Sequence, residues 1–71
     1  MCAAAEMLLA IADYVEAGGV RLAETTGSPE DDARVFSRIA LALAFSRAKP
    51  VVRLRAIFEG WDYTRIGREL Y

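Results

Sequence analysis

The sequence contains no histidine, and Cys2 is its single cysteine. Without histidine, a serine or cysteine nucleophile lacks its usual general base, and a thiol with no basic neighbour is not activated. One cysteine cannot form a disulfide network, and a metal site is left with carboxylate ligands only. These absences predict a protein that is not an enzyme, binds no cofactor and no metal, and acts by contact with a partner.

Long hydrophobic runs are absent as well. The longest apolar stretches, 39–45 and 7–12, are far shorter than the ~20 residues that cross a bilayer. No basic residues precede the first apolar stretch, which Glu6 interrupts, so a secretory signal is not expected. We therefore expect a soluble, cytoplasmic protein with no membrane contact.

The chain is short but rich in apolar residues. Its 71 residues allow one small domain, spanning 1–71. A chain of this length buries only about 60% of its unfolded surface, so the core is small. Apolar residues nevertheless make up 55% of the sequence. Because the excess must reach the surface, where apolar patches mark interaction sites, we expect a homodimer or docking on a larger protein.

Residues 3–24 show the period of a helix. Gly18 and Gly19 leave two hypotheses open: the helix stops at Ala17 with Gly18 as its C-cap, or it continues and Gly18 lets another helix approach closely. We favour continuation, because the apolar stripe keeps its phase. Its members follow one another in steps of three and four residues: Ala4, Leu8, Ile11, Val15, Gly18 and Leu22.

A second helix is expected from Pro29 to about Ala48. Ser28 is a typical N-cap, Pro29 suits the first turn, and the acidic residues 30–32 complement the positive end of the helix dipole. Pro50 ends this helix, since the residue before a proline disfavours the helical conformation.

Within the second helix, every residue from 39 to 45 is apolar. A stretch that is apolar all round a helix is normally buried on more than one side. Two helices in a hairpin cannot bury it alone, so a third helix or a second protomer must cover the remainder. We expect an oligomer interface at Ile39, Leu41, Leu43 and Phe45.

Two interpretations remain for residues 51–58. As a helix, with Pro50 in its first turn, the segment shares one face between Val51, Leu54, Phe58 and Trp61. As a strand, it would alternate apolar residues with Arg53 and Arg55 and would pair across a dimer. The composition favours the helix, and an isolated strand lacks a partner.

The expected fold is therefore all-α. An antiparallel helix hairpin is followed by one or two shorter C-terminal helices, and oligomerisation completes the structure. Gly60 ends the segment 51–58, and Asp62 is a plausible N-cap for a last helix from Tyr63 to Leu70.

Charge is divided between the two parts of the chain. Up to Asp32 there are seven acids and one arginine, a net of −6, and from Ala33 onward eight bases and three acids, a net of +5. We favour the interpretation that acidic and basic segments face each other, within one protomer or between two. The alternative is a nucleic-acid surface, with phosphate contacts at Arg47, Lys49, Arg53 and Arg55.

Aromatic residues and arginines gather near the C-terminus. Tryptophan, tyrosine and arginine dominate interface hot spots because they bury a large area and keep a polar handle. We predict a partner-binding site made of Trp61, Tyr63, Arg65, Arg68 and Tyr71. In the competing interpretation, which we favour for Trp61, Trp61 and Phe58 complete the core of the monomer.

The leading hypothesis is a small non-catalytic regulatory or adaptor protein that acts by protein–protein binding. One alternative is a nucleic-acid-associated accessory protein that uses the basic C-terminal half. Another is a small structural subunit of a multi-chain assembly.

Overall fold

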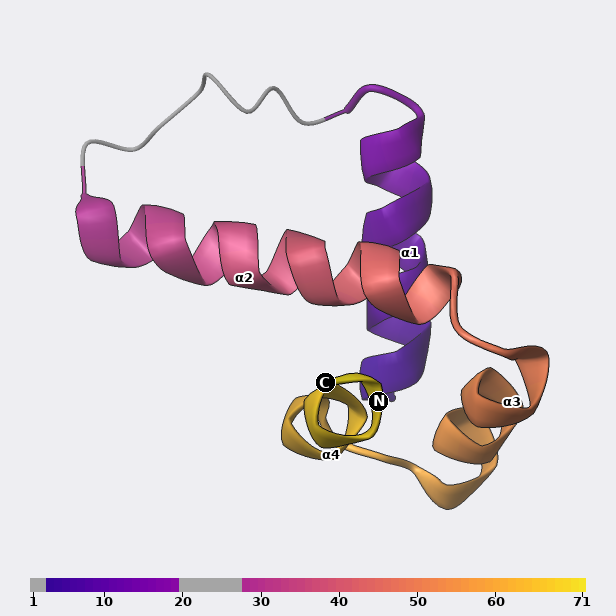
Figure 1. Cartoon of the computed structure of the whole chain (residues 1–71). Coiled ribbons are helices and arrows are strands. Elements are labelled where there is room, and N and C mark those ends of the chain that lie inside the picture. Colours follow the sequence, from indigo (N-terminus) through magenta and orange to yellow (C-terminus); the bar gives the residue numbers. More distant parts are fainter. Residues whose placement is uncertain (1–2, 20–27) are drawn as a thin grey trace.

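Four helices follow one another in the computed structural model, which describes residues 3–19 and 28–71 (Figure 1). They are α1 (Ala4–Glu16), α2 (Pro29–Ser46), α3 (Pro50–Glu59) and α4 (Tyr63–Leu70). No strand occurs in these described ranges. The all-α class is confirmed, and the strand alternative for residues 51–58 is wrong.

The first helix ends earlier than we predicted. Gly18 has a φ of +82°, in the left-handed region. Its N–H donates to the carbonyl of Val15 at 2.9 Å, and the N–H of Gly19 donates to the carbonyl of Tyr14 at 2.9 Å. This pair of bonds is the Schellman C-cap, which satisfies the last carbonyls of the helix. Continuation through Gly18 is therefore wrong, and Leu22 lies outside the described residues.

The start of α2 is confirmed. The Ser28 hydroxyl accepts a hydrogen bond from the N–H of Asp31 at 3.5 Å, and Pro29 is the first helical residue. The helix ends at Ser46, slightly before the predicted Ala48. There the guanidinium of Arg53 donates to the carbonyl of Ser46 at 3.2 Å and also to the carbonyl of Ala48. This arginine thus compensates carbonyls that the helix end leaves without a partner in the helix.

Two local signals also fix the last two helices. Gly60 has a φ of +66° at the C-cap of α3, and Asp62 caps α4, its carboxylate accepting from the N–H of Arg65 at 2.8 Å. The buried side of α3 is formed by Ala56, with Val52 and Ile57 packed against the core.

The core of the described residues lies where α1 meets the other three helices. Figure 1 shows α1 crossing the C-terminal half of α2 instead of running alongside its whole length, so the antiparallel hairpin is not confirmed. Four small residues at this centre let the helices approach closely. The buried cluster consists of Ala5, Leu8, Ala12, Ala42, Phe45, Ala56, Trp61 and Ile66.

The apolar stretch 39–45 is covered largely from within the chain. Phe45 is fully buried, Ile39 is 8% exposed, and both Leu41 and Leu43 pack against the core. The expected oligomer interface is wrong for Phe45, because α1 and α4 fold over this part of α2 and leave no surface there. None of the helices in the described ranges is long and apolar enough to span a membrane.

Candidate protein-binding surfaces

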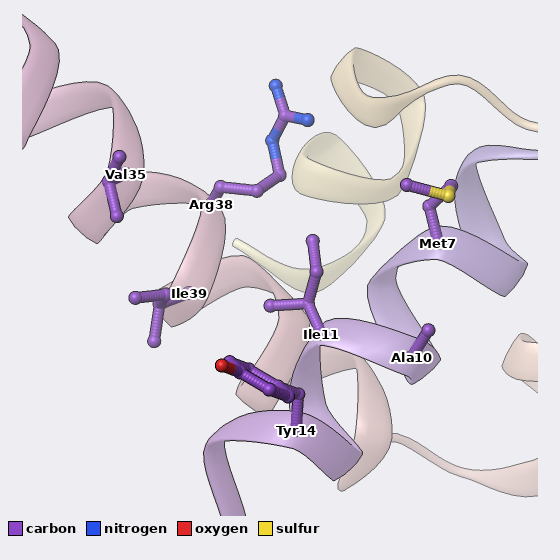
Figure 2. A pocket seen from close by; sticks show the side chains of 7 residues that line it. All are labelled: Met7, Ala10, Ile11, Tyr14, Val35, Arg38 and Ile39. Atoms are coloured by element: carbon purple, nitrogen blue, oxygen red, sulfur yellow. The ribbon is translucent and has the colours of Figure 1, made fainter. Parts of the chain in front are cut away.

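An apolar groove opens between α1 and the middle of α2 (Figure 2). We call it the α1–α2 groove. It has a volume of about 380 Å³ and is open to solvent. Four of its residues belong to α1 and three to α2: Met7, Ala10, Ile11, Tyr14, Val35, Arg38 and Ile39.

The groove exists because α2 extends beyond the helix that covers it. Ile39 is 8% exposed where α1 packs on α2, whereas Val35, one turn earlier on the same face, is 48% exposed. Before Ile39, every residue of α2 except Asp32 is exposed. The inward face of α2 therefore continues as an uncovered apolar surface.

Tyr14 forms one wall of the groove, and its ring has room because residue 19 is a glycine. A Cβ atom placed on Gly19 would lie 2.5 Å from Tyr14 Cζ, far inside van der Waals contact. The ring is exposed, and Figure 2 shows it on the same side as Ile11 and Ile39. The C-cap of α1 thus also shapes the groove.

Among the described residues, Arg38 is the one charged residue that lines the groove. Its guanidinium carbon lies 3.7 Å from the centroid of the Tyr63 ring on α4, a cation–π contact. In Figure 2 the side chain extends away from Val35 and Ile39. The groove therefore keeps an apolar floor while its cation is held at the edge.

A second apolar surface lies on α3 and consists of Val51, Leu54 and Phe58. We call it the α3 stripe. These side chains are 59%, 55% and 85% exposed, and their spacing of three and four residues places them on one face of the helix. Val51, Leu54 and Phe58 share a face as predicted, but this face points outward, and Trp61, which was predicted on it, lies beyond α3 and is buried. The interpretation that puts Phe58 in the core is wrong.

The corner between α3 and α4 is organised around the carboxylate of Glu59. Arg55 Nε lies 3.1 Å from it, Trp61 Nε1 lies 3.3 Å from it, and Arg65 lies 3.4 Å from it. The hydrogen bonds from Arg55 and Trp61 hold the pKa of Glu59 below its ordinary value. The guanidinium carbons of Arg65 and Arg55 lie 4.4 and 5.7 Å from the centroid of the Trp61 ring.

Several residues of the predicted partner-binding site make contacts within the chain at this corner instead. Trp61 is 3% exposed and belongs to the core, so its assignment to a partner surface is wrong. Tyr63 is half-buried beneath Arg38, and Arg65 is held by Glu59 and the Trp61 ring. Of the predicted set, Arg68 and Tyr71 are exposed.

The predicted phosphate contacts are mostly engaged within the chain. Arg47 forms an exposed ion pair with Glu16 at 3.9 Å, which joins the acidic and basic halves of the sequence. Arg53 is bonded to the carbonyls at the end of α2, and Arg55 to Glu59. Lys49 is exposed.

The described residues contain no group of three or more acidic, cysteine or histidine side chains placed to hold a metal ion. All buried residues in these ranges are apolar. Neither the protein-family models, nor the curated proteins, nor the solved structures contain a match to the chain.

Proposed function

We propose that this chain is a small, cytoplasmic, non-catalytic regulatory or adaptor protein that acts by binding another protein. The observation that carries the proposal is the α1–α2 groove, an open apolar surface between two helices. Large uncovered apolar patches are rare on small proteins unless they meet a partner.

The shape of the groove favours a helix of the partner as its occupant. A groove between two helices accepts the apolar face of an amphipathic helix, whose anchors are spaced three and four residues apart. Small-molecule sites instead enclose their ligand and carry several polar groups that orient it. Here the surface is open, and the guanidinium of Arg38, the one charged group that the described residues place along it, is already stacked on Tyr63.

Charge beside the groove specifies the partner further. The exposed carboxylates of Glu6 and Asp13 lie four residues before and three residues after Ala10, so they neighbour it on the surface of α1. A partner helix whose basic residues lie along α1 would be attracted to these carboxylates.

The groove can bury only a few apolar side chains of the partner helix. We therefore expect a dissociation constant on the order of micromolar.

The nucleic-acid alternative has less support. Binding to phosphates needs cations that are free to approach the backbone of the nucleic acid. Arg47, Arg53 and Arg55 each have a partner within this chain.

The test compares capture of host proteins by three tagged chains: the wild type, Val35→Glu and Ala40→Glu. The first substitution places a charge in the groove, and the second places the same charge on an exposed position of α2 outside it. We expect a partner that wild type and Ala40→Glu retain and Val35→Glu loses at least tenfold. The proposal is overturned if no protein shows this pattern, provided that all three chains have the same helical content by circular dichroism.

A further inference from the structure

The α3 stripe needs an explanation of its own, because it is separate from the α1–α2 groove. The other side of α3 already packs into the core through Val52, Ala56 and Ile57. Val51, Leu54 and Phe58 therefore remain as an outward seam of two turns. A seam with this spacing is the kind of surface through which two helices pack.

We propose that the α3 stripe binds the α3 stripe of a second copy of this chain, with the two helices antiparallel about a two-fold axis. This inference rests on α3 alone and does not depend on the proposed function of the groove. It gives the homodimer expected from the composition an interface at α3, in place of the 39–45 stretch.

The stripe is complementary to itself. Its midpoint falls between Leu54 and Arg55, because Val51 and Phe58 stand at equal distances from that point in the sequence. Rotation about an axis there brings Leu54 next to Leu54 of the second copy. The same rotation sets the small Val51 against the large Phe58 at both ends, so large and small side chains fill the seam together.

Charge selects the antiparallel arrangement. The exposed Lys49 precedes the stripe, and the exposed carboxylates of Glu59 and Asp62 follow it. An antiparallel pair places the basic end of one α3 beside the acidic end of the other, whereas a parallel pair would place like charges together. The second copy thus places acidic side chains beside Lys49, although Glu59 is already bonded to Arg55 and Arg65 of its own chain.

The small size of the α3 stripe predicts a weak dimer. Standard interfaces engage about 20–30 residues on each side, and the seam offers three apolar anchors. We therefore expect a dissociation constant on the order of 10–100 micromolar.

The competing occupant of the α3 stripe is the α1–α2 groove of another copy. That contact would be head-to-tail, and it would continue into open chains unless it closes into a ring.

Disulfide cross-linking under mild oxidation tests the arrangement, in full-length chains whose Cys2 is replaced by serine. Leu54→Cys lies beside the axis, so we expect it to link to itself. A mixture of Val51→Cys and Phe58→Cys chains is expected to form a mixed dimer faster than either forms a dimer with itself. Linkage of Leu54→Cys to Val35→Cys in place of itself would show head-to-tail docking and overturn the proposal.

Analytical ultracentrifugation from micromolar to millimolar concentration measures the affinity without cross-links. We expect Leu54→Glu to raise the dissociation constant at least tenfold and the control Ala40→Glu to leave it unchanged. Lys49→Glu is expected to raise it severalfold at low salt and much less at high salt, where charges are screened. A wild type that stays monomeric at millimolar concentration, or a Leu54→Glu chain that associates like wild type, contradicts the proposal.

Discussion

The guanidinium carbon of Arg38 on α2 lies 3.7 Å from the centroid of the Tyr63 ring on α4. This contact joins the C-terminal helix to the edge of the α1–α2 groove, because Arg38 also lines that groove. The position of α4 and the charge at the groove are therefore linked by one pair of side chains.

The first prediction concerns this pair. Replacing Tyr63 with leucine removes the aromatic face and should lower the free energy of unfolding by about 1 kcal/mol, the scale of a cation–π contact at a partly exposed site. Tyr63→Phe keeps the ring and should stay within a few tenths of a kcal/mol of wild type. Urea denaturation gives the free energy of unfolding of both variants. If both variants lose the same amount relative to wild type, the aromatic face contributes nothing to stability.

Trp61 should behave as a core residue. It is the single tryptophan of the chain and is 3% exposed, so its fluorescence should be blue-shifted and poorly quenched by acrylamide. Trp61→Ala should lower the free energy of unfolding by about 3–5 kcal/mol, enough to unfold a protein of this size. Tyr71→Ala, at an exposed position, is the control and should change it little. Strong quenching of the native protein would place Trp61 on the surface instead.

Glu59 should make stability depend on pH. Its pKa is lowered in the folded chain, chiefly by the hydrogen bond from Arg55 and then by that from Trp61. A lowered folded pKa means that the stabilisation is present above the ordinary pKa of about 4.5 and is lost as the pH falls through the folded value. Glu59→Gln should therefore be less stable than wild type at neutral pH, and the difference should shrink as the pH falls below the ordinary pKa of about 4.5. The free energies of unfolding of wild type and Glu59→Gln, measured from neutral to acidic pH, check this prediction. A difference between the two proteins that does not change with pH would contradict it.

Replacement by alanine should change the stability of the fold in opposite directions at two glycines. Gly18 has a left-handed backbone, so Gly18→Ala should destabilise the fold by about 1 kcal/mol. Gly67 lies inside α4, and a Cβ atom placed there meets nothing within 4 Å. Gly67→Ala should therefore stabilise the fold by about 0.5–1 kcal/mol. Thermal unfolding of both variants gives the two signs, and a stabilising Gly18→Ala would mean that the Schellman cap does not form.

Local signals allowed much of the fold to be predicted from the sequence. Ser28 with Pro29, and Gly60 with Asp62, mark helix ends by interactions within a few residues, and the structure confirms them. Gly18 shows where two local signals compete. The phase of the apolar stripe indicated continuation, but the left-handed conformation open to glycine ends the helix.

Which apolar faces are covered could not be predicted in the same way. Both sides of α3 carry apolar residues, and the way α3 packs into the core decides that Ala56 is buried and Leu54 is not. Val35 has the same periodicity as Ile39 and is exposed because α2 extends past α1. Such exposures depend on contacts between distant segments, about which helical periodicity carries no information.

The central claim is that the α1–α2 groove receives a helix of another protein, and site-specific photo-cross-linking in the host tests it most directly. A photoreactive amino acid is placed at Val35, in the groove, or at Ala40, an exposed position outside it. We expect a discrete cross-linked product from position 35 that is absent from position 40, with the partner joined through one face of an amphipathic helix. The same products from both positions, or none from position 35, would contradict the claim.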